Sequence, residues 1–382
     1  MKKYIGIGLS ILVAMMMVLG CAKKESEGGS EAQSSSTVAE SSSSETKKLS
    51  IVTTIFPAYD WVKQVVGDNE NVEISFLIDK GVDLHSYQAS AADIAKITES
   101  DLFVYVGGDS DDWAEDIIKE NPNLKYINMV DSIGEAALAE ELVEGMQEEE
   151  HDHDHGEHEE GEHEEHAHEE GDHDHEEHAH EEGEHDHEEH AHEEGEHDHE
   201  HADHDHEEEI DEHVWLSIKN AETIVSAIEA KLAEIDPDNK ADYEKNAKDY
   251  LAKLDELDKE YKETLSSIQN KTIIVGDRFP FRYLVNEYGI NYYAAFLGCD
   301  AGSEASFETV TFLANKMDEL NMSKIFIIDG SKGELAKTIV DNTKDKNATV
   351  LMLDSMQSTK SSDNANYIDI MRKNLEVLKD AL

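Results

Sequence analysis

The stretch TIIVGDRFPFRYLVNEYGINYYAAFL, residues 272–297, places two short apolar runs on either side of a helix-like segment. The runs Thr272–Val275 and Tyr292–Ala295 are predicted strands, and Phe279–Tyr288 is the predicted helix between them. This order of strand, helix and strand predicts two parallel strands with the helix packed on one face of their sheet.

The alternation of strands and helices extends over most of the chain. Downstream, the predicted elements are Phe307–Leu320, Lys324–Ile328, Lys332–Asp341, Thr349–Leu353 and Tyr367–Leu382. Upstream, they are Leu49–Phe56, Pro57–Val66, Val72–Ile78, a helix from the capping box Ser90-Ala91-Ala92-Asp93 to Glu99, Leu102–Val106 and Leu124–Ile127. Two such runs predict an α/β protein with two parallel-sheet lobes. We expect the binding site in the cleft between them, because ligands of open α/β sheets bind beyond the carboxyl ends of the strands.

Two helices are predicted between the runs, Ser217–Ile235 and the long, highly charged Asp238–Ile268. The second carries apolar residues at helical spacing and is the expected rigid rod that joins the lobes. The expected division of the chain is a signal peptide (1–20), a lipidated cysteine with a disordered tether (21–46), an N-terminal α/β lobe (47–237) that includes a disordered loop (148–209), a linking helix (238–268) and a C-terminal α/β lobe (269–382).

The N-terminus has the pattern of an export signal. Met1-Lys2-Lys3 is basic, and the apolar run Ile5–Leu19 is shorter than the roughly 20 residues that span a bilayer. The run ends in Val18-Leu19-Gly20-Cys21, which resembles the bacterial lipobox, so Cys21 is the predicted lipidated residue. The alternative is an uncleaved anchor helix. Either interpretation places the body of the protein outside the cytoplasm, anchored to the bacterial cell membrane.

The chain has two cysteines, Cys21 and Cys299. If Cys21 is lipidated, Cys299 has no disulfide partner. A Cys299 thiolate would be an excellent zinc ligand. The interpretation that we favour from the sequence is a small buried residue.

Residues 151–210 contain 30 Asp or Glu and no Lys or Arg, which is over half of the net charge of −57. Twenty of the 22 histidines lie in this tract, and HDHEEHAHEEGE repeats from His173 and from His185. We interpret it as a solvated loop with many weak metal sites, either a zinc collector or sensor, or a loop with incidental affinity. Its representative histidines are His151, His153, His155, His173, His175, His185, His187, His197, His199, His204 and His206. The acidic remainder of the chain argues against nucleic acid as a partner.

Two histidines remain outside the tract. His85 lies in Gly81-Val82-Asp83-Leu84-His85-Ser86-Tyr87, after a predicted strand, and His213 lies in Asp211-Glu212-His213-Val214-Trp215-Leu216. These segments resemble the Gly-x-Asp-x-His-x-Tyr and Asp-Pro-His-x-Trp-Leu motifs of the zinc and manganese solute-binding lipoproteins of ABC importers, with Glu212 in place of the proline. The resemblance covers residues 48–382, and it implies that His85 and His213 bind the metal.

The resemblance fails at the third ligand. That family places a histidine or glutamate in a segment such as His-Asp-Ala-Phe-x-Tyr, whereas this chain has Gly276-Asp277-Arg278-Phe279-Pro280-Phe281-Arg282-Tyr283, which contains no histidine. Asp277 is the nearest candidate, with an ion pair to Arg278 or Arg282 or a helix N-cap as the alternative, and Glu304 is a weaker substitute. Asp354, after the last predicted strand, matches the family's fourth ligand.

The resemblance implies an extracytoplasmic protein that captures zinc and delivers it to an ABC importer, with a permease and a cytoplasmic ATPase as partners. We expect a monomer. We also expect no enzymatic activity, because the chain has no His-Glu-x-x-His, Gly-x-Ser-x-Gly or phosphate-binding glycine loop. Two imidazoles with carboxylates suit zinc and also manganese. The alternatives are therefore a manganese-binding importer component and a histidine-rich surface metal store or adhesin.

Overall fold

The computed structural model describes residues 48–147, 209–299 and 305–382. The predictions for the signal peptide, the tether with Cys21, the histidine tract and Glu304 lie outside the described residues. None of the described helices has the length and apolar composition needed to cross a membrane.

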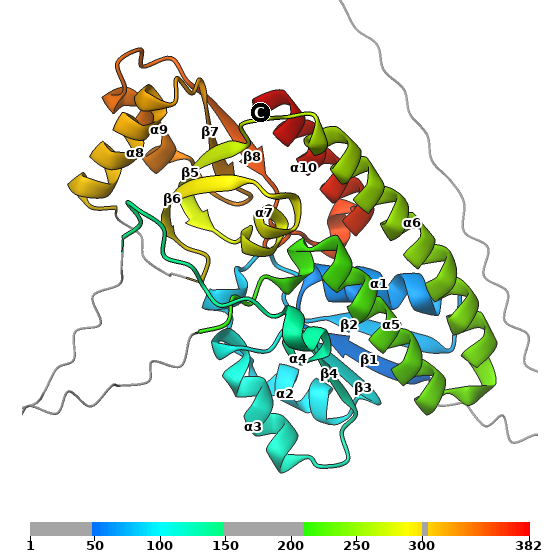
Figure 1. Ribbon diagram of the computed structural model, residues 1–382. Helices are drawn as coiled ribbons and strands as arrows, with labels where there is room; N and C mark the ends of the chain where they lie inside the picture. Colours follow the sequence, from blue (N-terminus) through cyan, green and yellow to red (C-terminus); the bar gives the residue numbers. More distant parts are fainter. Residues whose placement is uncertain (1–47, 148–208, 300–304) are drawn as a thin grey trace, which may run out of the picture. The chain divides into compact units, whose positions relative to one another are not determined.

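The first half of the described chain forms a four-stranded parallel sheet, drawn in blue and cyan in Figure 1. Its strands lie in the order β2-β1-β3-β4, with bounds β1 (Leu49–Thr53), β2 (Val72–Phe76), β3 (Leu102–Tyr105) and β4 (Tyr126–Asn128). The helices of this half are α1 (Phe56–Val66), α2 (Ala91–Thr98), α3 (Asp112–Glu120) and α4 (Met129–Ile133). The strand order reverses direction between β1 and β3, and ligands of open α/β sheets bind beyond the carboxyl ends of strands at such a point.

The second half repeats this plan with the order β6-β5-β7-β8. Its strands are β5 (Thr272–Phe279), β6 (Asn291–Leu297), β7 (Lys324–Ile328) and β8 (Thr349–Leu353). Its helices are α7 (Arg282–Tyr288), α8 (Phe307–Glu319), α9 (Glu334–Asn342) and α10 (Tyr367–Ala381). The prediction of an α/β protein with two parallel sheets is confirmed.

Local chemistry explains several element boundaries. Ser90 accepts a hydrogen bond from the main-chain N–H of Asp93, whose carboxylate accepts from the N–H of Ser90, so the predicted capping box starts α2. Strand β5 runs beyond its predicted end at Val275, through an irregularity in its pairing with β6. The helix that was predicted to start at Phe279 starts at Arg282. Phe279 precedes Pro280, and the residue before a proline disfavours the helical conformation.

Helices α5 (Ile218–Ile235) and α6 (Lys240–Ser266) lie between the two sheets in the sequence. The apolar stripe of α6 is buried: Tyr243, Ala247, Tyr250, Leu254, Leu257 and Tyr261. This helix packs on α1 and α5 and also on α10, where the Tyr261 hydroxyl donates to the carbonyl of Met371 at 2.6 Å. Figure 1 shows α6 running alongside these helices. Because it contacts elements of both halves, α6 ties them together along its length.

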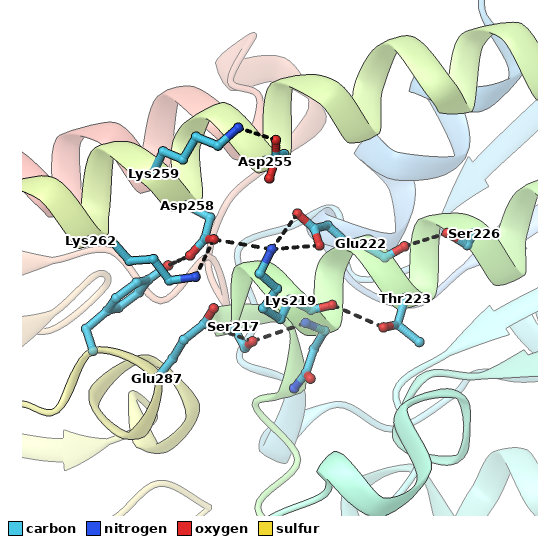
Figure 2. A network of polar contacts seen from close by, with 12 residues as sticks. Ser217, Lys219, Glu222, Thr223, Ser226, Asp255, Asp258, Lys259, Lys262 and Glu287 are labelled. Atoms are coloured by element: carbon cyan, nitrogen blue, oxygen red, sulfur yellow. Dashed lines mark hydrogen bonds and ion pairs between the residues drawn. The ribbon is translucent and has the colours of Figure 1, made fainter.

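A buried carboxylate fastens α5, α6 and α7 to one another. Figure 2 shows Asp258 of α6 between Lys219 of α5 and Lys262 of α6. Asp258 Oδ2 lies 3.2 Å from Lys219 Nζ and 2.7 Å from Lys262 Nζ, and Oδ1 accepts from the Tyr288 hydroxyl of α7 at 3.2 Å. The N-terminus of α5, which follows His213 closely in the chain, is thereby held by its two neighbours.

Candidate metal site

The two histidines outside the tract sit in short, well-anchored turns. His85 lies in a 3-10 turn (Leu84–Ser86) after β2, and its main-chain N–H donates to Asp83 Oδ1 at 3.1 Å. His213 directly precedes a second 3-10 turn (Val214–Leu216), and its N–H donates to Asp211 Oδ1 at 2.8 Å. In both turns an aspartate two residues earlier fixes the main chain of the histidine.

The fold brings these histidines together with a cysteine. Within the part of the chain that the structure describes, His85, His213 and Cys299 form one group whose ligand atoms all lie within 4.8 Å of one another. The Nε2 atoms of His85 and His213 are 3.2 Å apart. Cys299 follows the carboxyl end of β6, so the site lies where the two halves of the molecule meet.

The hydrogen-bond partners of the His85 and His213 rings indicate which ring nitrogen of each carries the proton. His213 Nδ1 lies 3.0 Å from Asp211 Oδ1, and a carboxylate only accepts, so Nδ1 carries the proton and the Nε2 lone pair is free. His85 Nε2 then donates to His213 Nε2, and His85 Nδ1 accepts from the Ser110 hydroxyl at 2.7 Å. For both Nε2 atoms to bind one metal, the His85 proton must move to Nδ1, where a neighbouring oxygen must accept from it.

The site keeps His85 neutral. Burial, followed by the adjacent His213, lowers the pKa of His85 to about 3. Its side chain is 5% exposed and that of His213 is fully buried. A metal therefore meets an unprotonated His85 at any physiological pH. Burial and the surrounding acidic residues Glu212, Asp211 and Glu140 raise the pKa of the Cys299 thiol.

Glu212, which stands where the related motif has proline, links the two histidine turns. Its Oε1 accepts from the main-chain N–H of Ser110 at 2.7 Å, and its Oε2 lies 3.7 Å from His85 Nδ1. Oε2 has no hydrogen-bond partner among the described residues. This buried oxygen can therefore accept the proton of His85 Nδ1 after the tautomer changes. Burial raises the pKa of Glu212.

The segment that carries His213 is bound to the second half of the molecule. The Tyr283 hydroxyl of α7 donates to the carbonyl of Asp211 at 2.8 Å. The Trp215 indole N–H donates to the carbonyl of Ser355 at 2.8 Å, and the Tyr367 hydroxyl of α10 donates to the carbonyl of Trp215 at 2.8 Å. Glu212 reaches the first half from the same segment, so His213 is held by both.

The chain matches the family described as zinc-uptake complex component A, periplasmic, over residues 51–381. The chain belongs to this family. It is 30% identical over 379 residues to the zinc-binding lipoprotein AdcA of Streptococcus pneumoniae, covering 99% of this chain and 61% of that relative. It thus spans about three fifths of the length of that relative. It is 29% identical to the high-affinity zinc uptake system protein ZnuA of Bacillus subtilis, over 100% of this chain and 98% of that one.

Solved structures of the zinc-uptake family share the fold. The Zn(II)-bound ZnuA-like domain of Streptococcus pneumoniae AdcA matches with a TM-score of 0.59 and 26% identity, over 87% of this chain and 98% of that domain. The metal-dependent lipoprotein YcdH of Bacillus subtilis matches with a TM-score of 0.61 and 26% identity, over 88% of this chain and all of the other.

The segment that resembles the third-ligand motif of the zinc-uptake family has another contact here. This segment contains no histidine, and a Cβ at Gly276 would lie 2.7 Å from Ala336 Cα in α9. A larger side chain therefore does not fit without moving the helix. Arg278, two residues on, forms an ion pair with Asp83, the residue that anchors the His85 turn.

The two carboxylates that the sequence offered as ligand candidates lie outside the group of His85, His213 and Cys299. Asp277 Oδ1 accepts from the main-chain N–H of Arg278 at 3.0 Å. Asp354 Oδ1 accepts from the main-chain N–H of Met356 at 2.9 Å, and burial, followed by the charge of Asp329, raises the pKa of Asp354 to about 6. Metal binding by either residue stays a prediction.

A glycine brings the cysteine loop against the His213 ring. A Cβ at Gly298 would lie 2.9 Å from His213 Cε1 and 2.8 Å from the carbonyl oxygen of Phe279. Only glycine permits this approach without a local shift. The pair Gly298-Cys299 was the sequence signal available for this part of the site, although the sequence does not show that it meets the histidines.

Proposed function

We propose that this protein captures zinc outside the cytoplasm and hands it to an ABC-type importer, with His85 and His213 as metal ligands. The observation that carries the proposal is the 3.2 Å separation of their Nε2 atoms. Two imidazole nitrogens bound to one tetrahedral zinc at about 2.05 Å are about 3.3 Å apart. The two nitrogens thus have the spacing that zinc requires.

Membership in the zinc-uptake family supports the transport role, and relatives named for zinc binding and zinc uptake support the choice of metal. The importer's permease and ATPase are the proposed partners, and we propose that the protein acts as a monomer. Cys21 is the proposed lipid anchor. Replacing it by serine is expected to release the protein from the membrane fraction, and a variant that stays membrane-bound would argue for an uncleaved anchor.

The test of the metal site uses a variant that lacks residues 150–207, so that the tract does not contribute. Zinc titration is expected to reveal one tight site, and His85→Ala or His213→Ala is expected to weaken it by more than about 100-fold. Tract histidines cannot compensate in this background. An unchanged tight site in the double variant His85→Ala, His213→Ala would overturn the proposal.

The same protein, titrated with manganese, distinguishes the manganese alternative. We expect weaker binding of manganese, because nitrogen-rich sites favour zinc. Preferential manganese binding would replace the zinc assignment. In the full chain, many loosely bound metals without a tight site would instead support the surface-store alternative. Zinc-limited growth that is unaffected by deletion of residues 150–207 would count against the collector role of the tract.

A further inference from the structure

We propose that the Cys299 thiolate is the third zinc ligand, which makes the site a nitrogen–nitrogen–sulfur centre. This inference rests on the proposed function and adds to it the identity of the ligand that replaces the missing histidine. It reverses the interpretation of Cys299 as a small buried residue, which was the favoured one from the sequence alone.

The geometry carries the proposal. The sulfur lies within 4.8 Å of the ligand nitrogens of both His85 and His213. On a tetrahedral zinc, a sulfur at about 2.3 Å and a nitrogen at about 2.05 Å are about 3.6 Å apart. The thiol therefore needs to approach by only about 1 Å to complete three coordination positions, a shift that a loop residue makes readily.

The alternatives for the third position are less suited. Residues 276–283, which resemble the third-ligand motif, contain no histidine, and Arg278 within them is paired with Asp83. Asp277 and Asp354 lie outside the group, and each already accepts a main-chain hydrogen bond. Cys299, by contrast, follows a glycine whose missing side chain lets the loop touch the His213 ring.

Coordination requires the thiol to lose its proton, and the charge of a bound zinc ion would drive this loss against the surrounding carboxylates. The thiol and the main-chain N–H of Cys299 both donate to the carboxylate of Glu140. When zinc binds, the zinc–sulfur bond forms, the S–H bond breaks, and the proton passes to Glu140 or to water. No oxidant or reductant is involved.

A thiolate ligand also bears on metal choice. Soft sulfur ligands favour zinc, whereas manganese prefers oxygen. The third ligand thus decides between the two metals that two histidines alone leave open. Replacing Cys299 by aspartate, which supplies oxygen instead of sulfur, is expected to weaken zinc binding and to narrow the preference for zinc over manganese.

The experiment uses the full chain loaded with cobalt(II), because a thiolate bound to cobalt gives an intense charge-transfer absorption in the near ultraviolet that imidazole and carboxylate ligands do not give. The tract binds cobalt without producing this band. The matched control is Cys21→Ser, which removes the other cysteine. We expect the band in the wild-type protein and in Cys21→Ser, and its loss in Cys299→Ser.

A second measurement covers the case in which Cys299→Ser fails to fold. In the Cys21→Ser background, one equivalent of zinc is expected to protect Cys299 from alkylation, and His213→Ala is expected to abolish this protection. Absence of the cobalt band, or unchanged alkylation in the presence of zinc, would overturn the thiolate ligand. If tight zinc binding persists without these thiolate signatures, only the thiolate ligand is overturned and the proposed function stands. If tight zinc binding is absent as well, the proposed function is overturned together with the thiolate ligand.

Discussion

His85 Nε2 and His213 Nε2 lie 3.2 Å apart, although the two residues are separated by 128 positions in the chain. In this contact His85 Nε2 donates to His213 Nε2. Zinc binding exchanges that hydrogen bond for two metal–nitrogen bonds at nearly the same spacing. Zinc binding to both Nε2 atoms therefore requires the movement of one proton across the His85 ring.

Ser110 should determine how easily that proton moves. Its hydroxyl donates to His85 Nδ1 and is the nearest oxygen to accept from this atom once the proton has moved there. Ser110→Ala is expected to weaken zinc binding by about tenfold, a typical cost of losing a group that orients a metal ligand. Competition with a chromophoric chelator, in the variant lacking residues 150–207, measures the change.

The control for Ser110 is Ser226→Ala on α5, whose exposed hydroxyl donates to the carbonyl of Glu222. It should leave the affinity for zinc unchanged. Equal affinities for Ser110→Ala and the wild type would show that Glu212 Oε2 alone accepts the proton of His85 Nδ1.

Arg278 should influence the metal site without touching it. Burial alone would raise the pKa of Asp83, but the hydrogen bond and charge of Arg278 outweigh burial and lower it. Because Asp83 also anchors the His85 turn, Arg278→Ala should loosen His85 and weaken zinc binding by about five- to tenfold. Zinc titration measures this effect, and thermal unfolding shows whether the fold is retained.

The matched control is Arg372→Ala, which breaks a surface ion pair with Glu260 between α10 and α6. It removes the same side chain far along the chain from the histidine turns, and surface pairs contribute little. An equal effect of the two substitutions on zinc affinity would contradict the positioning role of Arg278.

Much of the fold follows from local patterns. Lys324–Ile328 and Thr349–Leu353 have their predicted bounds, because each is a short apolar run with polar neighbours. Helix α3 was not predicted, although Ala114 and Ile117 face the core at helical spacing. Its nine residues and acidic first turn offered too little periodic signal.

The metal site was predictable only in part. His85 and His213 each sit in a local motif, and these motifs indicated them as ligands. The grouping of Cys299 with these histidines depends on three distant loops meeting. Such long-range packing is not encoded in any short stretch, so the sequence favoured the carboxylates Asp277 and Asp354 over Cys299 as ligands.

Asp111, in the turn after β3, should make stability depend on pH. Burial raises its pKa to about 7, although its carboxylate accepts from the main-chain N–H groups of Val106 and Gly107. In the unfolded chain its pKa is about 3.9, so between pH 4 and 7 the folded state binds more protons. The free energy of unfolding should therefore fall as pH rises through this window, by at most about 4 kcal/mol, and level off above it.

Urea unfolding in the presence of a chelator, at intervals from pH 4 to 8, measures this slope. Asp111→Asn should remove the part of the slope that Asp111 contributes, whereas Asp112→Asn, at the exposed first position of α3, should retain it. Identical slopes for the wild type and Asp111→Asn would show that Asp111 is ionised in the folded protein throughout this range.

Asp258 should matter for stability more than its neighbour on the same helix. It is 3% exposed and joins Lys219, Lys262 and Tyr288, whereas Asp255 forms an exposed pair with Lys259 (Figure 2). Because the two lysines stay half-exposed and water screens their charges, Asp258→Asn should lower the free energy of unfolding by about 1 kcal/mol at pH 7. Asp255→Asn, the matched control, should cause no measurable loss.

The effect of Asp258 should also vanish in acid. Burial alone would raise its pKa, but Lys262 and then Lys219 outweigh burial and lower it. A carboxyl whose pKa is lowered on folding contributes its stability above its unfolded pKa of about 3.9 and loses it as pH falls through the folded value. Denaturant unfolding at pH 7 and again below pH 4 should therefore show the difference between the wild type and Asp258→Asn shrinking with acidity. A difference that is constant with pH would mean that Asp258 acts through hydrogen bonding to Tyr288 and not through its charge.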